Sequence, residues 1–243
     1  MLKALIYDFD GTLTPYVCPQ FAILEKAGLE NGCDNPDFFA EVHRIAARDK
    51  LDVFDAMIRH ILAIVQAGGY ALTDENIALG ADSREYRPGV PEFLQRYQQL
   101  GVLNYLLSSG SKAYLAHTKI APFFAEIYAS TLKYNNQGEA TGPDHVMSTE
   151  AKIDSLKTIA TVCNGSAEDC SGLIYIGDGP TDIPVMTYTK AHGGITIMVC
   201  DEQNAAEVAK LSDQSAGQDV VSQRFAADFR TGSELDSFIK AQL

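Results

Sequence analysis

Short apolar runs, each ending in polar or glycine residues, recur along the chain. They are of strand length and cover residues 2–9, 102–107, 126–129, 173–176 and 195–199. A continuous apolar run of this length is typical of a strand buried on both faces, as in a parallel sheet. Each run therefore predicts a buried strand whose carboxyl end leads into a polar loop.

Segments with helical spacing of apolar residues separate several of these runs. One lies between Pro91, in its opening turn, and Gly101, which is placed to end a helix. Another follows Ser148 or Thr149, either of which can cap it. Strands that alternate with helices predict an α/β fold, a doubly wound parallel sheet whose ligands bind at the carboxyl ends of the strands.

The segment from residue 15 to residue 87 breaks this alternation. Its apolar positions keep helical spacing, Gly68-Gly69 is placed to end one helix, and Thr73 is placed to cap another. We expect a helical insert directly after the first strand. The predicted organisation is an α/β core of residues 1–14 and 88–243 with a small helical cap of residues 15–87.

Composition narrows the class of protein further. Of the 243 residues 46% are apolar, which excludes a disordered chain, and the formal net charge of −13 disfavours nucleic acid and anionic lipid as partners. The cysteines are scattered without a C-x-x-C pair, which disfavours a disulfide framework and a zinc site; they are Cys18, Cys33, Cys163, Cys170 and Cys200. The N-terminal stretch lacks the features of a signal peptide, and no run reaches the length of a membrane span. We expect a soluble, cytoplasmic protein.

Two acidic motifs follow predicted strands. Asp8 and Asp10 are two positions apart on an extended strand end, so their carboxylates point to the same side and repel unless a cation or a shared proton intervenes. Alone, the pair is equally typical of a turn or a helix cap. The second motif, Gly177-Asp178-Gly179-Pro180-Thr181-Asp182, also permits a structural interpretation, in which Asp182 caps the next helix. Together, these carboxylates suit Mg²⁺, which prefers oxygen ligands.

Two further polar positions complete the set of candidates. Ser108, with Ser109 and Gly110, offers a hydroxyl and backbone N–H groups that can bind an anion, although an ordinary loop has the same composition. Lys152 lies at the start of a predicted helix, where a solvated surface charge is the structural alternative.

The order of these motifs along the chain resembles that of a known enzyme superfamily. The chain resembles the phosphatase branch of the haloacid dehalogenase superfamily, whose four motifs correspond here to Asp8-Phe9-Asp10-Gly11-Thr12, Ser108-Ser109-Gly110, Lys152 and Gly177 to Asp182. The insert resembles the small helical cap of that superfamily. Within it, the stretch from Lys133 to Gly142 and the spacing of Gly179 and Asp182 are most similar to phosphoserine phosphatase-type enzymes. Those enzymes have a glutamate shortly after the first motif, whereas this chain reads Pro15-Tyr16-Val17-Cys18-Pro19-Gln20.

The resemblance implies a role for each residue. Asp8 is then the nucleophile that forms an aspartyl-phosphate, and Asp10 the acid and base. Mg²⁺ is held by the Asp8 carboxylate, the Asp10 backbone carbonyl and Asp178, with Asp182 orienting them, while Ser108, Ser109 and Lys152 hold phosphoryl oxygens. The implied substrate is a small-molecule phosphate monoester, with phosphomutase activity and non-catalytic ligand binding as alternatives. Among the cap arginines Arg44, Arg48 and Arg59, we favour Arg59 as a substrate contact because its helix resembles the arginine-bearing cap helix of the phosphoserine enzymes.

Overall fold

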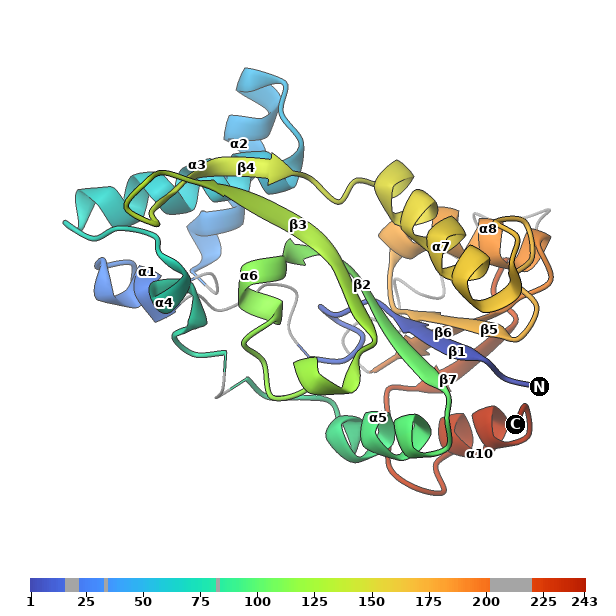
Figure 1. The fold of residues 1–243 in the computed structure, drawn as a ribbon. Helices are drawn as coiled ribbons and strands as arrows, with labels where there is room; N and C mark the ends of the chain where they lie inside the picture. Colours follow the sequence, from blue (N-terminus) through green and yellow to red (C-terminus); the bar gives the residue numbers. More distant parts are fainter. Residues whose placement is uncertain (16–21, 33–34, 82–83, 202–219) are drawn as a thin grey trace.

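A twisted seven-stranded sheet with helices on both faces forms the centre of the molecule (Figure 1). The computed structural model describes residues 1–15, 22–32, 35–81, 84–201 and 220–243. The strands are β1 (Ala4–Tyr7), β2 (Leu103–Ser111), β3 (Glu126–Tyr134), β4 (Ala140–His145), β5 (Leu173–Gly177), β6 (Ile195–Cys200) and β7 (Gln223–Ala226). Their order in the sheet is β4-β3-β2-β1-β5-β6-β7, and every neighbouring pair is parallel except β3 and β4. The predicted doubly wound α/β fold is confirmed.

The helices divide into a group on the sheet and a group inserted after β1. The first group is α5 (Val90–Gln99), α6 (Lys112–Leu115), α7 (Thr149–Asn164), α8 (Ile183–Ala191) and α10 (Glu234–Lys240), with 3-10 turns at Ala121–Phe123 and Pro180–Asp182. The second group, here called the cap, is α1 (Ala22–Lys26), α2 (Pro36–Asp49), α3 (Val53–Ala67) and α4 (Asp74–Ala78).

The central strand β1 is buried on both faces, as its apolar run predicts. Leu5 and Tyr7 belong to the hydrophobic cluster that includes α5, α10 and the cap, whereas Ala4 and Ile6 belong to the cluster that includes α7 and α8. Burial of all four side chains leaves no polar position within the strand. Polar residues therefore begin only where the strand ends, at Asp8.

The register of the sheet brings three strand ends to one level. In the parallel ladder Tyr7 of β1 lies opposite Leu106 of β2 on one side and Ile176 of β5 on the other. The next residues along each strand are Asp8, Leu107 and Gly177, so the polar motifs that follow must converge at one edge.

The sheet differs from expectation at β3, β4 and β7. The predicted strand at 126–129 continues to Tyr134 and turns back as β4, and the antiparallel pair forms a hairpin beside α3 (Figure 1). Asn135 closes the turn, because its side-chain oxygen accepts hydrogen bonds from the N–H groups of Gln137 and Glu139. The other strand, β7, was not predicted. Most of its side chains are exposed, so it has no apolar run to reveal it.

The β3–β4 hairpin is tied directly to the cap. The N–H of Ala140 donates to the carbonyl oxygen of Leu72 over 2.7 Å, and the Tyr134 hydroxyl donates to Asp74 over 2.6 Å. Because the hairpin extends from the sheet, these bonds join the cap to the core. The hairpin residues that make them are distant in sequence from both ends of the cap segment. The boundaries of the cap, residues 15 and 87, stay a prediction.

Three of the cap helices begin after a residue whose side chain caps them, and of these residues Thr73 was predicted. Asn35 and Asp52 each accept a hydrogen bond from the N–H two residues on, at the starts of α2 and α3, and Thr73 caps α4. Within the described part of the chain, none of the helices combines the length and the apolar content that crossing a membrane requires. Cys163, Cys170 and Cys200 are free thiols; Cys18 and Cys33 lie outside the described residues.

Asp236 joins the C-terminal helix to the rest of the core. Its fully buried carboxylate accepts hydrogen bonds from the N–H of Gly232 and from Arg96 on α5, and it pairs with Lys240. Burial by itself raises the pKa of Asp236, but these partners outweigh burial and lower it.

We expect Asp236→Asn to lower the free energy of unfolding at pH 7 by about 2 kcal/mol, because it removes a buried charge and leaves Arg96 without its partner. A lowered folded-state pKa means that the ionised form favours folding. This contribution is complete above the ordinary carboxyl pKa of about 4 and is lost as the pH falls through the lowered value.

Urea denaturation at several pH values measures the effect. The difference from the unmodified protein should shrink below about pH 4. Asp154→Asn is the matched control, because Asp154 is 72% exposed beside Lys157 and should change stability little. Equal effects of the two substitutions would contradict the role given to Asp236.

Candidate active site

Three acidic or polar segments meet at the carboxyl edge of the sheet. Asp8 and Asp10 follow β1, Ser108 and Ser109 lie near the end of β2, and Asp178 follows β5. The register described above places these three strands side by side. The structure thus brings together the residues that the sequence analysis assigned to one site, with the exception of Arg59.

Lys152 is buried and faces Asp8 directly. Its Nζ lies 2.9 Å from Asp8 Oδ1 and 3.5 Å from Asp182 Oδ1, and its side chain is 2% exposed. Burial by itself lowers the pKa of Lys152, but Asp8 and Asp182 raise it overall, so the ammonium stays charged. The alternative of a solvated surface lysine is therefore wrong.

The first turn of α7 explains why Lys152 reaches the site. Ser148 caps this helix, since its hydroxyl accepts from the N–H of Ala151, and the N–H of Lys152 donates to the carbonyl oxygen of Ser148. Lys152 therefore lies in the opening turn, beside the strand ends.

Asp182 organises the loop after β5. Its carboxylate accepts hydrogen bonds from the Tyr175 hydroxyl over 2.6 Å and from the N–H groups of Asp178 and Gly179. The side chain is 1% exposed and makes no capping bond to α8. Asp182 thus occupies the N-cap position of α8, but its side chain caps the preceding 3-10 turn and fixes the loop that carries Asp178.

Asp178 is held in place from the β1 side. Thr12 donates a hydrogen bond from its hydroxyl to Asp178 Oδ1 over 2.7 Å, and Gly11, with φ of 80°, leaves the space that the carboxylate fills. A Cβ on Gly11 would lie 2.2 Å from Asp178 Oδ2. The glycine of the first motif is therefore required both for its backbone conformation and for this close approach.

Burial among like charges perturbs the carboxylates of this edge. Burial raises the pKa of Asp8 to about 6 despite the opposing effect of Lys152. Burial, with the neighbouring Asp8 and Asp182, raises the pKa of Asp178 to about 8. The lysine and arginine side chains around these carboxylates therefore do not fully offset their negative charge.

This shortage of positive charge fits a divalent cation. Carboxylate oxygens of Asp8, Asp178 and Asp182 lie within 4.8 Å of one another. Those of Asp182 are already bonded to Tyr175, Lys152 and two backbone N–H groups, so Asp8 and Asp178 are the better side-chain ligands. The all-oxygen donor set is the one that Mg²⁺ prefers.

Asp10 lies beside an arginine that the sequence analysis did not select. The Arg84 side chain, 1% exposed, donates to Asp10 Oδ1 over 3.2 Å and to the Thr14 hydroxyl over 3.3 Å. Burial raises the pKa of Asp10 to about 7, against the lowering effect of Arg84. The arginine thus orients Asp10 and offsets part of its burial.

Arg87 makes a second contact from the same segment. It donates to the carbonyl oxygen of Gly11 from two nitrogens and pairs with Asp201 after β6. In the sequence this arginine marks only the end of the predicted cap segment. Nothing in the local pattern around Arg84 and Arg87 separates them from surface arginines; their burial is a result of tertiary packing.

The two serines near the end of β2 differ in orientation. The Ser108 hydroxyl is buried, accepts from the N–H of Gly110 and faces the site. The Ser109 hydroxyl instead donates to the carbonyl oxygen of Met147, so it ties β2 to the loop before α7. Ser108 is the better candidate for direct contact with an anion.

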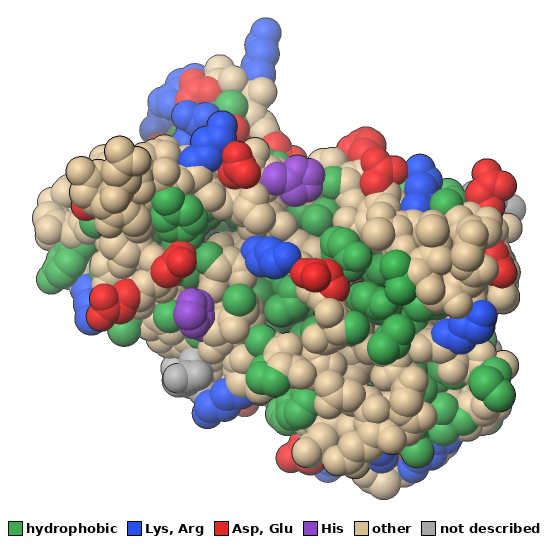
Figure 2. Space-filling model, viewed as in Figure 1, with side chains coloured by type: hydrophobic (Ala, Val, Ile, Leu, Met, Phe, Trp, Pro, Cys, Tyr) green, Lys and Arg blue, Asp and Glu red, His purple; other side chains and the backbone are tan. Residues whose placement is uncertain are grey.

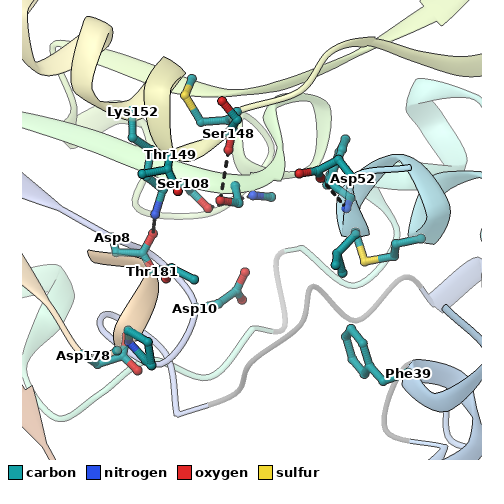
Figure 3. A pocket seen from close by; sticks show the side chains of 18 of the residues that line it. Asp8, Asp10, Phe39, Asp52, Ser108, Ser148, Thr149, Lys152, Asp178 and Thr181 are labelled. Atoms are coloured by element: carbon teal, nitrogen blue, oxygen red, sulfur yellow. Dashed lines mark hydrogen bonds and ion pairs between the residues drawn. The ribbon is translucent and has the colours of Figure 1, made fainter. Parts of the chain in front are cut away.

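A cavity of about 590 Å³ lies between these residues and the cap. The core contributes Asp8, Asp10, Ser108, Lys152 and Asp178, whereas the cap contributes residues of α2 and α3. Figure 3 shows Asp8, Lys152 and Asp178 on one side of this space and Asp52 and Phe39 on the other. A ligand here would contact the strand ends and the cap together.

The cap arginines considered in the sequence analysis do not line this cavity. Arg59 is 56% exposed and pairs with Asp55, Arg44 pairs with Glu41, and Arg48 pairs with Asp49. Basic side chains gather over α2 at the top of Figure 2, with acidic ones beside them, which agrees with an outer surface. The structure therefore places Arg59 outside the group of residues that share the site.

Two carboxylates after β1, a buried lysine and a second acidic loop meet at the carboxyl edge of a parallel sheet, which is an arrangement typical of an enzyme active site. The family model for haloacid dehalogenase-like hydrolases matches residues 5–187. The chain belongs to this family. The expected superfamily and its enzymatic character are confirmed.

Individual relatives agree with this assignment. The chain is 30% identical over 194 residues to the N-acetylmuramic acid 6-phosphate phosphatase of Pseudomonas aeruginosa, covering 75% of this chain and 76% of the relative. It is similar in fold to a substrate-bound phosphoserine phosphatase, with a TM-score of 0.63 and 18% identity over 99% of this chain and 98% of the other. A phospho-aspartyl intermediate analogue of phosphoserine phosphatase gives a TM-score of 0.62 and 19% identity, with 99% of both chains covered.

The fold is therefore of the phosphoserine phosphatase-like type. The segment in which those enzymes have their cap glutamate cannot be compared, because residues 16–20 lie outside the described residues.

We expect Gly11→Ala to weaken Mg²⁺ binding about tenfold or more, because the added Cβ would displace the carboxylate of Asp178. Isothermal titration calorimetry with Mg²⁺ measures this. Gly165→Ala is the matched control, since Gly165 has φ of 78° and a Cβ there meets no atom within 4 Å. It incurs the same backbone strain and should bind Mg²⁺ as the unmodified protein does. Equal affinity in the Gly11 variant would contradict the proposed cation site.

Proposed function

We propose that this protein is a Mg²⁺-dependent phosphatase that hydrolyses a small-molecule phosphate monoester through an aspartyl-phosphate on Asp8. The observation that carries the proposal is the convergence of Asp8, Asp10, Ser108 and Lys152 on one wall of the cavity. The curated relative is a phosphatase by its name, which supports the same reaction class; the sugar acid in that name is the substrate of the relative and is not assigned to this chain.

Asp8 is the proposed nucleophile. One carboxylate oxygen is bonded to Lys152, which fixes the side chain and leaves the second oxygen to attack phosphorus. In the first step the new bond joins an Asp8 oxygen to phosphorus while the bond from phosphorus to the alcohol oxygen breaks. In the second step water attacks phosphorus, the bond to Asp8 breaks and inorganic phosphate leaves.

Asp10 is the proposed acid and base. It lies two residues beyond Asp8 in the same cavity, and Arg84 orients it. In the first step it gives a proton to the departing alcohol oxygen, and in the second it takes a proton from the attacking water. The proton balance closes over one turnover.

The proposed Mg²⁺ would be held by the carboxylates of Asp8 and Asp178 and the backbone carbonyl of Asp10. When bound, it would neutralise the charge of the nucleophile and the phosphoryl group. Asp182 and Thr12 keep Asp178 in position for this.

Ser108 and Lys152 are the proposed contacts for the remaining phosphoryl oxygens, together with the backbone N–H of residue 109. Such donors stabilise charge where it develops, without rearrangement during the reaction. Ser109 acts through its bond to Met147, which positions this loop. We retain the predicted cap of residues 15–87 and a cytoplasmic enzyme acting on small molecules as parts of the proposal.

Substitution of the two motif aspartates tests this proposal. We expect Asp8→Asn to lower kcat at least about 1000-fold, because the amide cannot act as the nucleophile, and Asp10→Asn to lower it about 100-fold or more. Release of inorganic phosphate from 4-nitrophenyl phosphate, with Mg²⁺ and after chelation, measures both.

Full activity in the Asp8 variant, or activity that survives chelation unchanged, would contradict the assignment. Phosphorus NMR of the products separates hydrolysis from phosphoryl transfer. A rearranged phosphate ester in place of inorganic phosphate would show a mutase.

A further inference from the structure

The cap side of the cavity is largely apolar. Its lining includes Phe39 from α2, and Val53, Phe54 and Met57 from α3, with Met147 of the core beside them. The phosphoryl-binding groups lie on the opposite wall, at the strand ends (Figure 3). A phosphate ester bound with its phosphorus near Asp8 would therefore direct its alcohol part against an apolar surface.

A single carboxylate interrupts this apolar surface. Asp52 lines the cavity on the side opposite Asp8 (Figure 3). Its position is fixed, because it caps α3 by accepting a hydrogen bond from the N–H of Phe54 over 2.7 Å. A negative charge therefore faces the alcohol part of any bound ester.

The positive charges near the cavity are committed elsewhere. Among the described residues that line it, Lys152 is the one lysine or arginine, and it is bonded to Asp8 and Asp182. The cap arginines are paired with acidic residues on the outer surface, as described above. An acidic group on the alcohol part of a substrate would thus meet Asp52 without a described cation to offset it.

We propose that the cap selects phosphate esters of apolar, non-acidic alcohols and that Asp52 is the residue that rejects esters carrying a second acidic group. This inference rests on the proposed phosphatase function and names its substrate class. Attraction comes from burial of the apolar alcohol part, and discrimination comes from the charge of Asp52.

Two matched aryl esters test the discrimination. 4-Carbamoylphenyl phosphate and 4-carboxyphenyl phosphate have nearly the same size and shape, but only the second carries an additional negative charge. Both esters are assayed at the same pH and the same Mg²⁺ concentration. We expect kcat/KM to be about tenfold higher for the carbamoyl ester.

The variant that tests Asp52 is Asp52→Asn, because asparagine caps a helix as well as aspartate does and preserves the start of α3. We expect it to raise kcat/KM for the carboxy ester about fivefold relative to that for the carbamoyl ester, since one unit charge is removed. Asp55→Asn is the matched control. Asp55 lies on the same helix, pairs with Arg59 and does not line the cavity, so its substitution should leave the ratio unchanged.

A series of n-alkyl phosphates tests the apolar half of the inference. KM should fall by up to about fourfold with each added CH₂ group until the cavity is filled, in both the unmodified protein and the Asp52 variant. A KM that does not change along the series would overturn the assignment of an apolar alcohol.

The outcomes separate this inference from the function on which it rests. Absence of hydrolysis of every ester would contradict the phosphatase function itself. Hydrolysis that depends on Asp8 but proceeds equally well with both aryl esters, or a ratio unaffected by Asp52→Asn, would overturn the inference and leave the phosphatase function standing.

Discussion

The confinement of several carboxylates around one buried lysine is the constraint on which this structure depends. Carboxylate oxygens of Asp8, Asp178 and Asp182 lie within 4.8 Å of one another at the sheet edge, and Lys152 pairs with Asp8 and Asp182. Like charges so placed repel, and burial strengthens the repulsion. Each is therefore secured by a dedicated partner, and Asp182 in particular is bonded through both carboxylate oxygens. The site is preorganised for a cation because the protein alone does not balance its charge.

The second constraint is the way the cap is joined to this edge. The chain leaves the cap through a segment whose Arg84 contacts Asp10 and whose Arg87 contacts the carbonyl oxygen of Gly11. On the opposite side, the β3–β4 hairpin bonds to Leu72 and Asp74. The exit of the cap is therefore part of the site itself, so the position of the cap and the orientation of Asp10 are physically coupled.

Much of the core and its motifs could be predicted because the signals are local. Five apolar runs located five strands of the sheet, since a strand buried on both faces has little choice of residue. The β7 strand was not predicted because its side chains are mostly exposed. The β3–β4 hairpin was not predicted because its turn is built by the hydrogen bonds of Asn135. Arg59 was favoured as a substrate contact because its helix resembles the arginine-bearing cap helix of the phosphoserine enzymes. Its side chain instead pairs with Asp55 on the outer surface of the cap. Which face of a cap helix meets the site depends on how the cap sits on the core, and no local pattern encodes that.

The sequence alone determined the order of the motifs and the chemistry available at each, because short apolar strands and the Asp, Ser and Lys residues near their ends can be identified from the chain itself. It also determined that position 11 is a glycine, but it did not show that a side chain at this position would occupy the space of the Asp178 carboxylate. Tertiary structure decided which charges meet: that Lys152 is buried against Asp8, that Arg84 reaches Asp10, and that Asp52 faces the cavity. These contacts join residues up to 144 positions apart, and such pairs are fixed only when the sheet, the helices and the cap pack together.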